Sequence, residues 1–228
     1  MMNITVNHQN NPEYESLLDD LIREVFGFSF APWFERKLWD ERYESYSIVH
    51  GSKMLANVCI YNDFYPRFGF QQVQTYSPRL VVAIDNGPGN TLQYSLDDDF
   101  VRGMLYGKRV YSKVVDSANM QPVQMFHLLM EYSGGIYYLP GCDALVVAAR
   151  EDDALFLADV ITQKPIVFDE LLRELPFYGV KHVKFGFNPD RLGISPTWEP
   201  ANRGEEPFFV KGDWNLPKVF CFPAMSIT

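Results

Sequence analysis

The segment Asp63–Phe70 holds the residues whose types and spacing point most directly to chemistry. It reads Asp-Phe-Tyr-Pro-Arg-Phe-Gly-Phe, so a tyrosine hydroxyl stands among aromatic rings shortly before a glycine. A tyrosine O–H can donate a proton or a hydrogen bond when the chain holds it in position. Tyr65 is therefore the residue singled out for chemistry. The alternative is that it packs with Phe64, Phe68 and Phe70 in an aromatic cluster.

Helices and a pair of strands upstream must position this segment. Residues 45–61 carry β-branched and aliphatic side chains on both sides of a His50-Gly51-Ser52-Lys53 turn, which predicts a β-hairpin. Apolar residues at helical spacing predict helices over Pro12–Phe26 and Ala31–Glu41. Only Asn62 separates the predicted hairpin from the tyrosine segment.

The stretch Phe64-Tyr65-Pro66-Arg67-Phe68-Gly69-Phe70 resembles the Phe-Tyr-x-x-x-Gly-Phe signature of the GNAT acyl-CoA N-acyltransferases. Flanking residues 26–35 and 46–58 are similar to the opening of a Firmicutes-type subgroup in which a second half follows. The stretches 135–138, 143–147 and 220–223 resemble that second half. The resemblance implies an α/β (α+β) fold with a GNAT-like mixed sheet flanked by helices. We expect a truncated N-terminal half over residues 1–84, a linker over 85–90 and a degenerate GNAT-like half over 91–228.

The activity that this resemblance implies is transfer of an acetyl group from acetyl-CoA to the amine of a small molecule or peptide. In such enzymes the tyrosine that matches Tyr65 can protonate the leaving thiolate. A base must deprotonate the amine, and the candidates bordering the expected cleft are Glu35, Glu41, Glu44 and His50. No spacing distinguishes one of them from the others.

One part of the family pattern is missing from this chain. GNAT domains carry a strand, a glycine-containing turn and a helix between the hairpin and the tyrosine segment, and amides at the helix start hold the CoA pyrophosphate. Such a unit needs roughly 30 residues or more, whereas Asn62 stands alone here. Gly87-Pro88-Gly89 predicts a linker, and Thr162–Ile166 lacks glycine and makes a poor phosphate loop. The alternative function is therefore a catalytically inactive GNAT-derived scaffold or binding protein that has lost CoA binding.

The second half shows the alternation of strands and helices expected of a mixed sheet. The pattern predicts strands over 92–96, 154–161, 180–187, 208–211 and 219–222, helices over 100–110, 121–132, 168–175 and 189–192, and a hairpin turning at Leu139–Asp143. The missing unit leaves sheet edges that need cover. We expect the hairpin and the strand over 71–84 to pair directly, or to pair with another copy in a homodimer.

Composition limits the remaining possibilities. A net charge of −9 argues against nucleic acid and against anionic membranes. The polar start of the chain and the lack of long apolar runs predict a cytoplasmic protein without a membrane segment. Cys59, Cys142 and Cys221 are expected to be small buried side chains, and no His, Cys or carboxylate spacing predicts a metal site.

Overall fold

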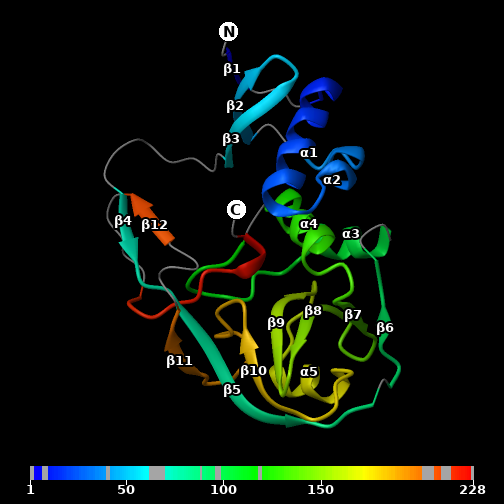
Figure 1. Ribbon diagram of the computed structural model, residues 1–228. Coiled ribbons are helices and arrows are strands. Elements are labelled where there is room, and N and C mark those ends of the chain that lie inside the picture. The colour runs from blue at the N-terminus through cyan, green and yellow to red at the C-terminus, as the bar shows by residue number, and fades with distance from the viewer. Residues whose placement is uncertain are drawn as a thin grey trace. The chain divides into compact units, whose positions relative to one another are not determined.

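The computed structural model describes residues 3–6, 10–39, 42–61, 70–87, 89–95, 99–117, 120–201, 208–211 and 217–226. The chain divides into two compact units, residues 1–66 and residues 67–227 (Figure 1). We expected a different division, into two halves of GNAT-like origin on either side of residues 85–90. The compactness of the units does not test the origin of these halves, so that division stays a prediction.

The N-terminal unit contains two helices and a three-stranded antiparallel sheet in the order β1-β2-β3. Its elements are β1 (Asn3–Val6), α1 (Pro12–Phe26), α2 (Ala31–Glu35), β2 (Tyr43–His50) and β3 (Lys53–Tyr61). The side chain of Asn11 caps α1 by accepting a hydrogen bond from the Glu13 amide at 3.1 Å. Gly27 ends the helix with φ of 77°. The predicted bounds of α1 are confirmed because both end signals are local in the sequence.

Helix α2 is shorter than predicted, since it ends at Glu35 rather than at Glu41. The left-handed backbone of Lys37, with φ of 50°, explains why the helix does not continue. Aromatic rings pack together on both sides of this turn. The Trp33 ring stacks on the Trp39 ring with 4.6 Å between their centroids, and the Tyr43 ring meets the Trp39 ring edge to face with 4.1 Å between centroids. These rings connect the helices to the start of β2.

The C-terminal unit is built on a seven-stranded mixed sheet in the order β11-β5-β10-β9-β8-β7-β6. Strands β9 and β10 are parallel, and the other neighbouring pairs are antiparallel. The strands are β5 (Tyr76–Ile84), β6 (Leu92–Gln93), β7 (Ile136–Leu139), β8 (Ala144–Glu151), β9 (Ala154–Ile161), β10 (Val180–Phe185) and β11 (Thr197–Pro200). A separate two-stranded sheet pairs β4 (Phe70–Val73) with β12 (Phe208–Lys211).

Helices flank this sheet, which confirms the predicted fold class of a mixed α/β protein. They are α3 (Asp99–Tyr106), α4 (Gln121–Met130), α5 (Phe168–Glu174) and the short 3-10 helix η1 (Ala224–Ser226). Phe168 and Leu171 of α5 lie in the core with the apolar side chains of β8, β9 and β10. Strand β9 is buried along almost its whole length, as expected for a strand covered on both faces.

Several expectations from the sequence are wrong. The neighbours of β5 are β10 and β11, so within the described residues direct pairing with the β2–β3 hairpin is wrong, whereas pairing with another copy stays a prediction. Residues 190–193 form a turn rather than a helix, and residues 219–222 are not a strand. Cys59 is exposed and Cys142 half-buried, so only Cys221 is the buried side chain that was expected.

Candidate functional site

The structure places only part of the site that the sequence predicts. Tyr65 and Glu41 lie outside the described residues, so the role of Tyr65 stays a prediction. Glu35 and His50 are exposed, at the end of α2 and of β2. Glu44 accepts a hydrogen bond from the Tyr46 hydroxyl at 2.7 Å, and this bond raises the pKa of Tyr46. The contact that Glu44 makes is thus with its own strand.

The end of β3 bears directly on the missing cofactor segment. The strand runs to Tyr61, and the tyrosine segment begins at Asp63. One residue cannot form a strand, a turn and a helix. The chain is therefore too short at this point to hold the expected pyrophosphate-binding unit of strand, turn and helix before Tyr65.

The C-terminal unit has its own strand, connection and helix, formed by β9, residues 162–167 and α5. Strands β9 and β10 pair from Ala154 opposite His182 to Leu157 opposite Phe185, and the amide of Gly186 adds a bond of 2.9 Å to the Leu157 carbonyl. Strand β9 then continues to Ile161, and among the described residues no strand pairs with it on that side beyond Leu157. In sheets with parallel strands, ligands bind in the crevice at the carboxyl ends. The residues around the carboxyl ends of β9 and β10 are therefore the candidate functional site.

The C-terminal segment of the chain packs beside the carboxyl ends of these strands. The buried side chain of Asn188 donates to the Cys221 carbonyl at 2.7 Å and accepts from the Cys221 amide at 2.8 Å. The Ala224 amide bonds the Gly186 carbonyl at 2.6 Å. A Cβ on Gly186 would come within 2.9 Å of the Ala224 Cβ, so glycine permits this close approach. The segment 220–226 is therefore packed tightly beside the ends of both strands.

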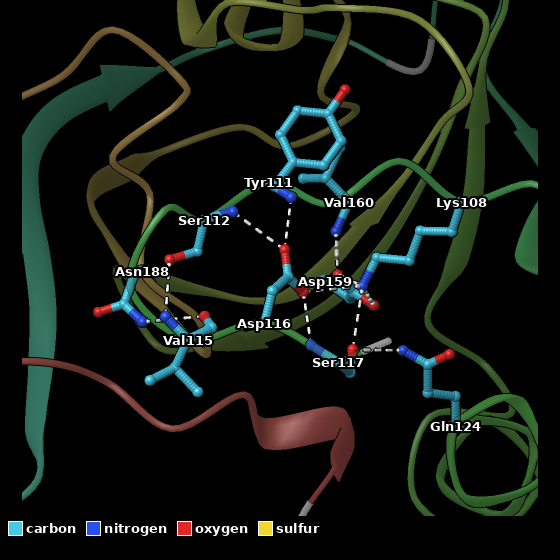
Figure 2. A network of polar contacts seen from close by, with 10 residues as sticks. All are labelled: Lys108, Tyr111, Ser112, Val115, Asp116, Ser117, Gln124, Asp159, Val160 and Asn188. Atoms are coloured by element: carbon cyan, nitrogen blue, oxygen red, sulfur yellow. Dashed lines mark hydrogen bonds and ion pairs between the residues drawn. The ribbon is translucent and has the colours of Figure 1, made fainter. Parts of the chain in front are cut away.

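The loop 107–117, between α3 and α4, also contacts the ends of these strands and carries a buried charge network (Figure 2). The Lys108 amino group lies 2.9 Å and 2.7 Å from the two carboxylate oxygens of Asp159 on β9. It also lies 3.8 Å from the carboxylate of Asp116. The three side chains are only 7 or 8% exposed. A β-bulge opposite Val147 and Ala148 immediately precedes Asp159 and alters the direction of the strand at this carboxylate.

Main-chain amides of the same loop surround Asp116. One carboxylate oxygen accepts from the amides of Tyr111 and Ser112, the latter at 3.0 Å, and the other accepts from the Ser117 amide at 2.7 Å. The side chain of Asn188 donates to the Val115 carbonyl at 3.2 Å, which ties the loop to the segment after β10. The loop thus spans from β9 to the chain beyond β10.

The electrostatics of the network follow from its burial. Burial raises the pKa of Asp159, the nearby Lys108 opposes this rise, and the charge of Asp116 adds to it. Burial also raises the pKa of Tyr111 to about 12, and its hydroxyl donates to the Lys164 carbonyl at 2.6 Å. The amino group of Lys108 is both buried and paired, so it is not presented to a substrate as a nucleophile or base.

The start of α5 does not fit the pyrophosphate of a CoA molecule. The Phe168 amide donates to the Leu192 carbonyl at 2.9 Å, and the Val167 amide donates to the Glu170 carboxylate at 3.2 Å. Asp169 and Glu170 in the first turn would repel an anion. These contacts agree with the prediction that Thr162–Ile166 is a poor phosphate loop.

Sequence reasoning did not find the charge network, although one signal was present. Asp159 is the single acidic residue in the apolar strand Ala154–Ile161. A carboxylate in a buried strand requires a partner, because an unpaired buried charge is very costly. The identity of that partner, 51 positions away in the chain, was not readable from any local pattern.

Comparison with known proteins finds partial structural similarities. Neither a family model nor a curated protein matches the chain. A conserved protein of unknown function from Enterococcus faecalis V583, described as a probable N-acyltransferase, has 11% identity and a TM-score of 0.43, covering 88% of this chain and 71% of its own. A GCN5-related N-acetyltransferase from Kribbella flavida has 11% identity and a TM-score of 0.36, covering 80% and 64%. At these TM-scores and identities, neither structure indicates what this chain binds or catalyses.

Two further observations concern other kinds of site. Across the described ranges, no helix has the length and apolar character needed to cross a bilayer. The same ranges contain no group of three or more His, Cys, Asp or Glu side chains placed to hold a metal ion. The predictions of a cytoplasmic protein and of a homodimer stay predictions.

Proposed function

We propose that this chain is a GNAT-like N-acyltransferase that transfers an acetyl group from acetyl-CoA to the amine of a small molecule or peptide. The observation that carries the proposal is the Phe64–Phe70 segment, which follows directly after the β2–β3 hairpin. Acetyl-CoA would supply the acetyl group. Tyr65 is the proposed proton donor of this reaction.

The N-terminal unit is the proposed location of this chemistry. The start of α5 has its amides paired and its first turn acidic. Beyond β9 and β10 the side chain of Asn188 is hydrogen-bonded to Val115 and Cys221 of the chain itself. The C-terminal unit therefore offers the cofactor neither amide donors nor space at these positions, and the transfer is assigned to the part of the chain around Tyr65.

The substitution Tyr65→Phe tests the proposal. We expect this variant to transfer acetyl groups to a panel of amine-bearing peptides about 100-fold more slowly than the natural protein, with unchanged thermal stability, because general acid catalysis contributes at least this factor. Acetylated product is measured by mass spectrometry. Tyr178→Phe is the matched control, since Tyr178 is 70% exposed on the C-terminal unit. Equal rates of acetyl transfer by the two variants would show that Tyr65 is not the proton donor.

The second candidate function is a catalytically inactive scaffold or binding protein. The end of β3 at Tyr61 favours it, because the three residues between this strand and Tyr65 are too few for a strand, a turn and a helix whose amides could bind a pyrophosphate. A thermal shift measurement separates the candidates. A cofactor present at 100 times its Kd stabilises a protein by about 2.7 kcal/mol. A clear shift with millimolar acetyl-CoA supports the transferase, and the absence of any shift supports the scaffold.

A further inference from the structure

The carboxylate of Asp116 is the point on which the donors of the loop 107–117 converge. It accepts hydrogen bonds from three main-chain amides, those of Tyr111, Ser112 and Ser117. The Lys108 amino group lies 3.8 Å away. We propose that residues 108–117 form a binding site for a small oxyanion, such as a carboxylate or a phosphate, and that the protein's own Asp116 occupies it.

The donor set is the kind that binds anions in proteins. Successive main-chain amides in a turn make concave sites for phosphate, and a lysine adds a charge-assisted interaction. The hydroxyl of Ser112 accepts from the amides of Val114 and Val115, at 2.9 Å and 3.2 Å. This second set of bonds fixes the curvature of the loop. Part of the loop's conformation is therefore fixed by contacts that do not involve Asp116.

Asp116 behaves as a ligand of this loop more than as the ion-pair partner of Lys108. Asp159 already takes that place, with both carboxylate oxygens within 2.9 Å of the amino group. The shortest contacts of Asp116 are with amides, not with the ammonium. Its side chain is 8% exposed, so the internal carboxylate excludes solvent anions from the site.

The position of the loop agrees with a binding site. It bridges the carboxyl ends of the parallel strands, through Lys108 and Asp159 on one side and Val115 and Asn188 on the other (Figure 2). Ligands of sheets with parallel strands bind at this position. This inference is independent of the proposed acyl transfer, because it concerns the C-terminal unit alone.

Removal of the internal ligand tests the proposal. In Asp116→Gly the amides lose their acceptor and the loop gains space for a small anion. We expect a lowered Tm in chloride that rises with added formate or phosphate along a saturating curve, at constant ionic strength. The natural protein should show no saturating rise, because Asp116 is a tethered competitor. Asp190→Gly is the control, since the exposed Asp190 accepts from a single amide, that of Lys113, at 2.8 Å.

A second variant keeps the test open if the glycine variant does not fold. Asp116→Ser removes the charge with a smaller change in backbone freedom and still leaves room for formate. A saturating rise in Tm with formate in either variant, absent from the control, supports the internal-ligand site. An equal response of the control, or no saturating response in a folded Asp116 variant, overturns it.

Discussion

The substitution Lys108→Met tests how the buried network supports the C-terminal unit. Methionine keeps most of the length of the side chain and removes its charge, so the carboxylates of Asp159 and Asp116 remain buried without a cation, at 7% and 8% exposure. Removing one partner of a buried ion pair costs about 3–5 kcal/mol. For a unit of this size we expect the Tm to fall by roughly 6–20 °C at neutral pH.

The pH dependence of this deficit is the sharper part of the prediction. Burial already raises the pKa of Asp159 in the folded protein, and loss of Lys108 raises it further. A carboxyl group whose pKa is raised by folding favours the folded state while it is protonated, and this contribution is lost as the pH rises through the folded pKa. The deficit of Lys108→Met should therefore shrink as the solution is made mildly acidic.

The measurement is unfolding in denaturant, monitored by hydrogen exchange in peptides that cover β9. These peptides report on the C-terminal unit alone. Lys184→Met is the matched control, because Lys184 pairs with Glu151 at 2.7 Å while both side chains are 42 to 49% exposed. Such a surface pair contributes about 0–1 kcal/mol. A Lys108 variant that loses no more stability than the control, or a deficit that does not change with pH, would refute the reasoning.

Two other predictions follow from the same unit. Asn188→Ala removes three hydrogen bonds and leaves buried main-chain groups of Cys221 without this partner, so we expect a loss of about 2–4 kcal/mol and faster hydrogen exchange in peptides covering 217–226. Burial and the neighbouring Glu174 raise the pKa of Cys142 to about 12, so iodoacetamide near pH 8 should alkylate it far more slowly than the exposed Cys59 in peptide mapping. Equal alkylation rates would contradict that environment.

Elements with local signals were predictable from the sequence. The bounds of α1 and β9 were predicted as the structure has them, because capping residues mark the helix and an apolar run interrupted only by Asp159 marks the strand. The hairpins β2–β3 and β7–β8 follow from glycine-containing turns between apolar segments. Helix α5 was predicted to within one residue for similar reasons.

Features that depend on distant partners were not predictable. Strand β11 carries little β-branched bulk and exists because its four residues pair with β5, far away in the chain. The bonds between Lys108 and Asp159, and between Asn188 and Cys221, join segments with no shared sequence pattern. Tyr65, the predicted catalytic residue, lies outside the described residues, so the structure does not test that prediction.

The most direct test is hydrogen exchange with and without millimolar acetyl-CoA, resolved by peptides. If the transferase chemistry belongs to the N-terminal unit, acetyl-CoA should slow exchange in peptides spanning 55–66 and leave peptides spanning 158–167 and 186–190 unchanged. Slower exchange in the latter peptides would instead place the cofactor at the carboxyl ends of β9 and β10 and contradict the assignment to the N-terminal unit. Unchanged exchange throughout would contradict the proposed transferase.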